Sequence, residues 1–419
     1  MRVPCQCQRV EAARQSDLRE RNLAAVLGAV ARSEQPVSRA GLADRTGLTR
    51  ATVSALVELL LGSDLLVESA PPPRAGAGRP AVGLALSGAR VAALGAEIGV
   101  DYLAACVRDL TGAVRLREVV VGDNRGQPAA AVVARSAELA GRLLEQASGL
   151  GLEVVGATWA VPGLVDAARR CVLLAPNLGW SDVDVAALLA AAPGGAALAG
   201  RPVVVDNEGA LAALAEVGHP APPTPEGLLV VSGEVGIGAG VVLGGRLSRG
   251  QHGWSGELGH VTVALDGPPC TCGALGCLEV YAGQEAVLRA AGRAGPPGTA
   301  LGSGGGVLLG LAREGDGPTL AALVVAGRAL GVAVAGAVNL LDVDAVVLGG
   351  IYAPLGPWLL PHVQAEVDRR VLRSRLLHVP VRTSTTGPDA AVLGAAAAVL
   401  QDVLRTPAAA LLPAAPVGA

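Results

Sequence analysis

The first ninety residues carry apolar positions at helical spacing. One helix face is marked by residues at i, i+3, i+4 and i+7, namely Leu23, Val26, Leu27 and Val30. A second helix is predicted to begin after Ser38 as its N-cap and to stop at Gly47. A third is predicted over residues 50–61, capped by Thr49, with an apolar face of Val53, Leu56, Val57 and Leu60.

Two short strands are predicted to follow these helices. Residues 65–67 form one apolar run, and alternating apolar positions at residues 82–86 predict a returning strand after a Pro-rich loop at 71–80. The turn Thr46-Gly47-Leu48 is typical of a helix-turn-helix. The pattern therefore predicts a mostly α winged helix-turn-helix over residues 18–88, preceded by a flexible N-terminus at 1–17.

The pattern changes to alternating strands and helices from residue 91. A first segment predicts strands at 91–98, 103–108 and 113–121, a helix at 129–147 and a strand at 154–160. A second segment repeats the plan, with strands at 228–232, 237–243, 261–264 and 345–348 and helices at 319–340 and 389–403. Two such units predict a two-lobed α/β domain over residues 89–404 with a ligand cleft between the lobes, and a disordered tail at 405–419.

Composition narrows the class of protein. The chain has 419 residues, enough for two or three domains, and it contains no Lys and no Phe. This bias is typical of a GC-rich genome, so the Ala-rich stretches carry little structural information. Uninterrupted apolar runs such as 390–400 are too short to cross a bilayer, and the N-terminus lacks the apolar core of a signal peptide. We therefore expect a cytoplasmic protein with no membrane partner.

Charge separates the N-terminal part from the rest. Residues 1–90 hold 12 Arg against 8 acids, a balance of +4, whereas the remainder has a balance of −7. A basic head on an acidic body favours a nucleic-acid-binding module. The residues predicted to contact DNA lie at the helix starts, along the third helix and in the Pro-rich loop: Ser38, Thr49, Arg50, Thr52, Ser54 and Arg79. The alternative is a helical dimerisation or protein-binding module with a Pro-rich linker.

Three of the seven cysteines, Cys270, Cys272 and Cys277, are closely spaced. In a reducing compartment, cysteines this close are more often metal ligands than disulfides. A redox-active thiol cluster is the alternative.

Several motifs resemble the ROK family of repressors, open reading frames and sugar kinases. The main ones are VSGEVGIGAGVVLGGRLSRGQHGWSGELGH at 231–260 and CTCGALGCLE at 270–279, with further matches at 161–166, 175–180 and 206–208. The resemblance covers about residues 85–403, and the preceding helix-turn-helix is similar to the regulator branch of the family. It implies an actin-like, hexokinase-like fold, a homodimer or tetramer, and a sugar ligand.

The resemblance also implies two sets of site residues. A zinc would be held by His260, Cys270, Cys272 and Cys277, a Cys3His set that leaves no open position and so favours a structural metal. The effector sugar would be contacted by Gly163, Asn177, Asn207, Glu208, Glu257, His260 and Glu279. Carboxylates and amides suit sugar hydroxyls, which both donate and accept hydrogen bonds. Taken singly, Glu257 or Glu279 is equally compatible with a solvated surface acid.

The positions that move phosphate in active ROK kinases depart from the family pattern. Residues 97–101 read Glu-Ile-Gly-Val-Asp and lack the second Gly and the Thr of the first phosphate turn. Residues 234–238 read Glu-Val-Gly-Ile-Gly, which places Glu234 and Val235 where phosphates should approach. Glu208 stands in place of the catalytic Asp, and Ile351-Tyr352 follows Leu348-Gly349-Gly350. We therefore assign no catalytic residue and expect no enzyme activity.

These features together predict a sugar-responsive DNA-binding regulator, with repression as the default direction, of genes for carbohydrate uptake and catabolism. A sugar or sugar phosphate in the degenerate kinase cleft would change the affinity for operator DNA. The alternative is an ATP-dependent hexose or N-acetylhexosamine kinase with an autoregulatory DNA-binding head. A regulator controlled by a transporter subunit instead of a sugar also remains open.

Overall fold

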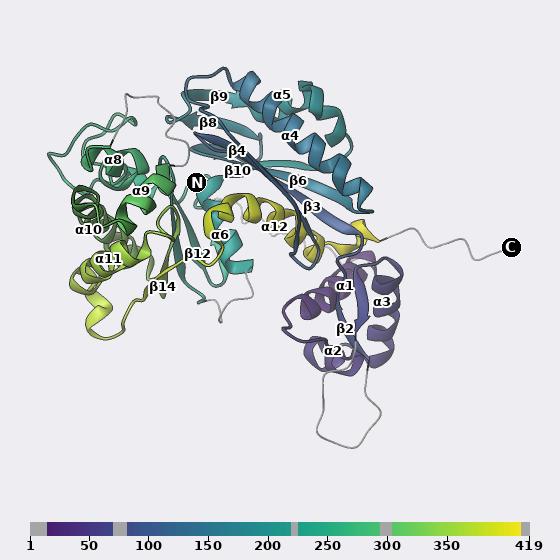
Figure 1. Cartoon of the computed structure of the whole chain (residues 1–419). Helices are drawn as coiled ribbons and strands as arrows, with labels where there is room; N and C mark the ends of the chain where they lie inside the picture. The colour runs from purple at the N-terminus through teal and green to yellow at the C-terminus, as the bar shows by residue number, and fades with distance from the viewer. Residues whose placement is uncertain (1–14, 70–81, 219–224, 294–303, 412–419) are drawn as a thin grey trace, which may run out of the picture. The chain divides into compact units, whose positions relative to one another are not determined.

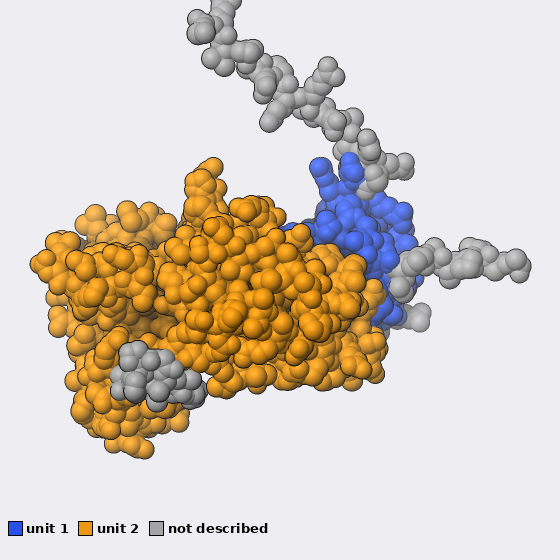
Figure 2. Space-filling view, turned by 90° about the horizontal axis from the view of Figure 1, so that it is seen from above, with its two compact units in different colours: residues 1–91, 400–419 blue, residues 92–399 orange. Residues whose placement is uncertain are grey.

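The computed structural model describes residues 15–69, 82–218, 225–293 and 304–411. The chain divides into two compact units, residues 1–91 with 400–419, and residues 92–399 (Figure 2).

The first unit contains the predicted helices and ribbon (Figure 1). Its elements are α1 (Gln15–Ala31), α2 (Arg39–Thr46), α3 (Arg50–Gly62), β1 (Leu66–Ser69) and β2 (Gly83–Leu86). Ser38 Oγ accepts a hydrogen bond from Gly41 N at 3.1 Å, and Thr49 Oγ1 accepts from Thr52 N at 3.2 Å, so both act as N-caps. Gly47 ends α2 with a φ of 70°, which glycine adopts without steric cost. The strands β1 and β2 pair antiparallel.

Both ends of this unit are more ordered than the sequence predicts. The helix α1 begins at Gln15, inside the segment expected to be flexible. Residues Pro407–Ala410 form the 3-10 helix η5, and Arg90 donates to Ala410 O at 2.5 Å and to Ser63 O at 2.8 Å. The prediction of a tail disordered from residue 405 is therefore wrong as far as residue 411, because Pro407 and Ala410 are buried. Residues 412–419 lie outside the described residues.

The second unit begins with a five-stranded sheet in the order β10-β6-β3-β4-β5. Its strands are β3 (Val91–Ile98), β4 (Tyr102–Asp109), β5 (Val114–Val121), β6 (Glu153–Val161) and β10 (Val203–Asn207). A smaller sheet of β7 (Leu164–Asp166), β8 (Cys171–Ala175) and β9 (Trp180–Asp184) adjoins it, with α4 (Ala129–Gly149) and α5 (Val185–Ala191) packed alongside. Apolar residues of these elements form one core, which defines the first lobe.

The second lobe is built on a sheet in the order β13-β12-β11-β14-β15. These strands are β11 (Leu228–Gly233), β12 (Ile237–Leu243), β13 (Arg246–Ser248), β14 (Ala345–Gly350) and β15 (Val381–Thr383). Its core is shared with α7 (Glu279–Ala282), α8 (Gln284–Ala290), α9 (Gly304–Arg313), α10 (Gly317–Leu341) and α11 (Gly356–Arg370). The two lobes repeat the β-β-β-α-β plan expected from the sequence.

One predicted strand of this lobe is wrong. Residues 261–264 form no strand, and the third strand of the sheet is β13 instead. The predicted segment contributes one isolated bridge, from Thr262 to Cys277, and the Val261 side chain is 44% exposed. The alternating apolar residues predicted a strand, but this segment meets the cysteine-rich turn through that single bridge and does not pair along a neighbouring strand.

Two helices lie between the two large sheets, α6 (Glu208–Gly218) and α12 (Ala390–Arg405) (Figure 1). One side of α6 packs on β11 and β12, and its other side packs on α12 and β6. The backbones approach closely: a Cβ on Gly209 would lie 2.7 Å from Ala239 N, and one on Gly394 would lie 2.6 Å from the carbonyl carbon of Leu211. Glycine is therefore needed at both positions, and the contacts fix the start of α6 at the junction of the lobes.

Two segments, Gly317–Leu341 and Gly387–Arg405, are long and apolar enough to cross a membrane by length and composition alone. In their most apolar windows, 61% and 50% of the residues are buried inside the protein, which is typical of core helices.

Candidate functional site

The predicted metal ligands come together in the loop that follows β13. The ligand atoms of His260, Cys270, Cys272 and Cys277 all lie within 4.8 Å of one another. Cys270 Sγ is 3.7 Å from His260 Nδ1, and Cys272 Sγ is 3.7 Å from Cys277 Sγ. Ligands about 2.3 Å from a tetrahedral zinc are separated by about 3.8 Å. The four residues therefore fit a tetrahedral metal ion, and Nδ1 is the His260 nitrogen that faces the thiols.

Asn207 connects the end of β10 to the turn after β6. Its Nδ2 donates to Gly163 O at 2.9 Å, and its Oδ1 accepts from Ala210 N at 3.0 Å, which caps α6. Gly163 has a φ of 91° and lies against the backbone of β8, so a side chain would not fit there. The two predicted sugar-binding residues are therefore adjacent and rigidly held.

Asn177 and Glu279 meet from opposite lobes. Asn177 Nδ2 is 3.4 Å from Glu279 Oε1, and Glu279 Oε2 accepts a hydrogen bond from Ile237 N at 3.1 Å. Glu257 Oε2 lies 4.0 Å from His260 Nε2, the ring nitrogen that faces away from the thiols. The second ring nitrogen of His260 is therefore on the side of Glu257, away from the thiols.

Glu208 lies where these groups converge, at the first position of α6. Burial raises the pKa of Glu208 to about 8. The neighbouring charges that add to this shift come from Glu97, Glu257 and Glu279. Glu208 is therefore close enough to Glu257 and Glu279 for their charges to raise its pKa, and it lines a pocket together with Asn177.

Tyr102 covers the turn that carries the first phosphate motif, and the sequence analysis missed it. A Cβ on Gly99 would lie 2.6 Å from the Tyr102 ring, and the Tyr102 hydroxyl donates to Glu97 Oε1 at 2.6 Å. Glu97 is 2% exposed, and burial raises its pKa to about 7. A tyrosine directly after the motif at 97–101 was the available signal.

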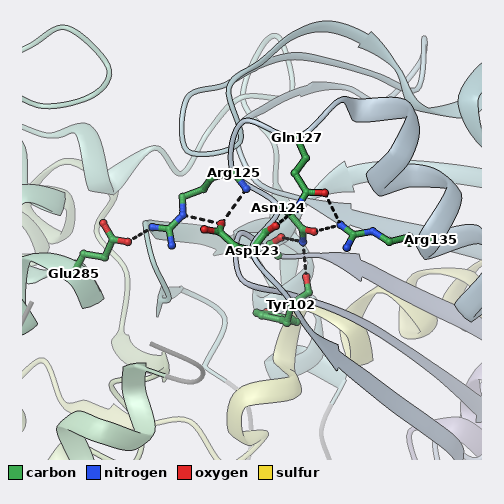
Figure 3. Close-up of polar contacts among 8 residues, drawn as sticks. Tyr102, Asp123, Asn124, Arg125, Gln127, Arg135 and Glu285 are labelled. Atoms are coloured by element: carbon green, nitrogen blue, oxygen red, sulfur yellow. Dashed lines mark hydrogen bonds and ion pairs between the residues drawn. The ribbon is translucent and has the colours of Figure 1, made fainter. Parts of the chain in front are cut away.

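Asn124 fixes the turn at residues 99–102 through hydrogen bonds to its backbone (Figure 3). Its Nδ2 donates to Gly99 O at 2.8 Å and to Tyr102 O at 3.1 Å, and its Oδ1 accepts from Arg135 at 2.5 Å. The adjoining Arg125 pairs with Asp123 in its own lobe and with Glu285 of α8 in the other lobe (Figure 3). A single polar network therefore fixes the first turn and links the two lobes.

Side chains of the protein also occupy the space beside Gly233 and Gly350, at the ends of β11 and β14. A Cβ on Gly350 would lie 2.8 Å from Glu234 Oε1, so the Glu234 carboxylate covers the end of β14. The Tyr352 ring fills the space beside Gly233, and its buried hydroxyl donates to Ala282 O at 2.9 Å. Burial raises the pKa of Glu234 well above its ordinary value.

The predicted DNA-contacting residues are placed on the first unit, apart from Arg79, which lies outside the described residues. Arg50 and Ser54 are exposed on α3, and Thr52 is half-buried beside the capping Thr49. Arg39, which the sequence analysis did not select, is paired with Glu58 and Glu68.

The raised pKa of Glu97 predicts a pH-dependent stability that the variant Glu97→Gln should lack. The folded carboxyl, with a pKa of about 7, holds its proton where the unfolded one, near 4.5, has lost it. Stability should therefore fall as pH rises from about 5 to 7, by at most about 1.4 kcal/mol per pH unit from this group. As the pH rises over this range, the free energy of unfolding of the variant should therefore increase relative to that of the wild type. Urea unfolding at pH 5, 6, 7 and 8 measures it, and parallel curves for the two proteins would contradict the placement of Glu97.

Known proteins resemble this chain both in sequence and in fold. The ROK family model matches residues 93–402. The xylose repressor of Bacillus subtilis is 28% identical over 369 residues, covering 88% of this chain and 92% of that protein. A solved ROK family transcriptional regulator, a homolog of the E. coli MLC protein, has a TM-score of 0.73 at 24% identity and covers 93% of this chain and 97% of its own.

The kinase branch is similar over the second unit. A ROK family glucokinase from Streptomyces griseus, solved with glucose and AMPPNP, has a TM-score of 0.61 at 26% identity and covers 73% of this chain and 98% of its own. The predicted fold class, a helical N-terminal part followed by a two-lobed α/β domain, is confirmed by these likenesses. The chain belongs to the ROK family.

Proposed function

We propose that this chain is a sugar-responsive transcriptional repressor that binds operator DNA through its first unit and an effector sugar in the cleft of its second. The observation that carries the proposal is the contrast within the cleft: the polar residues suited to sugar hydroxyls are paired and oriented, while the glycine turns suited to phosphates are covered. The similarity to a xylose repressor over 88% of the chain supports the same conclusion.

The chemistry of the cleft suits a polyhydroxylated ligand. Asn177 and Asn207 supply amide groups, while Glu257 and Glu279 supply acceptor oxygens from the second lobe. Each sugar hydroxyl both donates and accepts, so a mixed set of amides and carboxylates on separate loops can bind neighbouring hydroxyls. Because the set spans both lobes, a bound sugar would hold the cleft closed.

Phosphoryl transfer is disfavoured by the same geometry. A kinase needs glycine turns open to phosphates and a base that accepts a proton from the attacking hydroxyl. Here Tyr102 covers the first turn, Glu234 covers the end of β14, and Glu208, with a pKa of about 8, is protonated at neutral pH. We infer that the chain is not an enzyme.

The His260 and cysteine cluster supports a structural zinc site. With Nδ1 of His260 and three thiolates as ligands, the metal would have no open coordination position. It would fix His260 Nε2 toward Glu257 and brace the segment that leads into Glu279. The zinc would therefore support sugar binding without taking part in any reaction.

The first unit supports DNA binding through α3. Arg50 and Ser54 are exposed near the start of that helix, where a recognition helix meets base edges and phosphates. Ser38 and Thr49 cap their helices, and the Thr49 hydroxyl shares a hydrogen bond with the hydroxyl of Thr52. These three residues are proposed to approach phosphate oxygens, and Arg79 is proposed from the sequence alone. A homodimer or tetramer in the cytoplasm would present two such helices to operator half-sites, and sugar-driven closure would change their spacing.

Operator binding should depend on both units. We expect the purified protein to bind promoter DNA upstream of its own gene, and xylose, glucose or N-acetylglucosamine to weaken that binding. Arg50→Ala should weaken DNA binding by about tenfold or more, since a lost base or phosphate contact costs about 1–3 kcal/mol. Glu257→Gln should retain DNA binding but lose the response to sugar.

Fluorescence anisotropy with labelled promoter fragments measures both effects. Arg313→Ala, on the exposed surface of α9, removes the same charge from the second unit and is the matched control for Arg50→Ala. Operator affinity that is unchanged across the whole sugar panel would contradict the proposed function.

The metal should be present at one zinc per chain. Cys272→Ser removes an exposed ligand and should abolish stoichiometric zinc, whereas Cys171→Ser, outside the cluster, should retain it. Elemental analysis measures the content, and sugar titration of the metal-free protein measures the consequence. Full sugar affinity in zinc-free protein would contradict a supporting role for the metal.

A further inference from the structure

The inner end of the cleft is a small pocket that continues from the sugar-binding residues. Its cavity volume is only about 20 Å³, and its lining includes Asp101, Tyr102, Asn177, Glu208 and Glu234. Asn177 and Glu208 also belong to the proposed sugar site, so a substituent on a sugar hydroxyl that faces them would enter this pocket. The chemistry of the pocket therefore limits what the bound sugar can carry.

A phosphate group in the pocket would need N–H donors or cations. Three backbone N–H groups of the two glycine turns are already used by the protein. Gly99 N donates to Tyr102 O at 3.0 Å, Glu234 N donates to Gly236 O at 2.8 Å, and Ile237 N donates to Glu279 Oε2 at 3.1 Å. A phosphate would have to break these bonds before it could be bound.

The described side chains around the pocket offer an anion no cation. Asp101, Glu208 and Glu234 line it, and no Arg or His is among its lining residues in the described part of the chain. The cation that acts on Asp101 is Arg125, whose guanidinium is already paired with Asp123 and Glu285. A phosphate in this buried pocket would therefore have no free counter-charge, and the burial that raises the pKa of Glu208 and Glu234 also disfavours the charge of a phosphate.

The other residues of the proposed sugar site also lack a free cation that could bind a phosphate. Its other acidic residues are Glu257 and Glu279, and its one basic side chain, His260, faces the thiols through Nδ1 and Glu257 through Nε2. A phosphate on any hydroxyl that these residues contact would lie beside a carboxylate.

We propose that the effector is an unphosphorylated sugar. Its phosphorylated form would be excluded by Glu234, by Asp101 and by the Tyr102 ring that covers Gly99. The inference rests on the proposed function, because it concerns the ligand of that same cleft. It makes the cleft a sensor of sugar that has entered the cell without being phosphorylated. Glu234 is the specificity-determining residue because it lies in the pocket and outside the set that contacts the sugar.

Matched pairs of ligands test the proposal by isothermal titration calorimetry. The probes are xylose with xylose 5-phosphate, glucose with glucose 6-phosphate, and N-acetylglucosamine with its 6-phosphate. For any sugar that binds, the phosphorylated partner should bind at least about 30-fold more weakly, the effect of about 2 kcal/mol. Glu234→Gln keeps the size of the side chain and replaces its carboxyl with an amide, whose N–H groups can donate to phosphate oxygens, so it should narrow that ratio by at least about threefold. Glu314→Gln, at an exposed position, is the matched control and should leave the ratio unchanged.

The possible outcomes separate this inference from the proposed function. Equal or tighter binding of a phosphorylated partner by the wild-type protein would overturn the inference and leave a sugar-responsive repressor standing. Binding of neither form in any pair would contradict the proposed function itself. An unchanged ratio in folded Glu234→Gln, verified by its thermal unfolding, would overturn the role of Glu234, while the wild-type comparison tests the exclusion of phosphate independently.

Discussion

The close approach of α6 to its neighbours is the constraint on which the cleft depends. Gly209 lets the first turn of α6 rest on Ala239 of β12, and Gly394 lets α12 lie against Leu211 on the opposite side. Because both contacts involve backbone atoms, α6 has little freedom to shift between the two sheets. Asn207 and Glu208 are thereby held at the junction of the lobes, where the other polar residues of the cleft converge.

This scaffold is compatible with catalysis and with ligand sensing, and a few side chains favour the second role. The glycines of the phosphate turns are retained, but Tyr102 and Tyr352 fill the space that glycine leaves open. The backbone donors of the turns satisfy the protein's own acceptors. The carboxyl groups that replace phosphate contacts are buried and carry raised pKa values, so the pocket is built to remain free of anions.

Local pattern predicted much of the fold, and motifs predicted the site. Apolar periodicity in α1 and α3 was sufficient because those faces are buried, and the spacing of Cys270, Cys272 and Cys277 was sufficient for the cluster. The strand expected at 261–264 and the disorder expected from residue 405 were wrong because distant partners decide both segments. The Arg125–Glu285 pair was missed for the same reason, since residues 160 apart in sequence meet only in the folded chain. Tyr102 was missed although its contacts with Glu97 and Gly99 are local, because the sequence does not show where its ring turns.

The central claim is that the cleft retains carbohydrate recognition while its nucleotide side is closed. A crystal structure of the protein grown with a bound sugar and soaked with AMPPNP tests this most directly. The account predicts sugar density between Asn177, Asn207 and Glu257, and Tyr102 and Glu234 in place with no nucleotide at the glycine turns. Phosphate density against Gly99 or Gly236, with Tyr102 displaced, would contradict it.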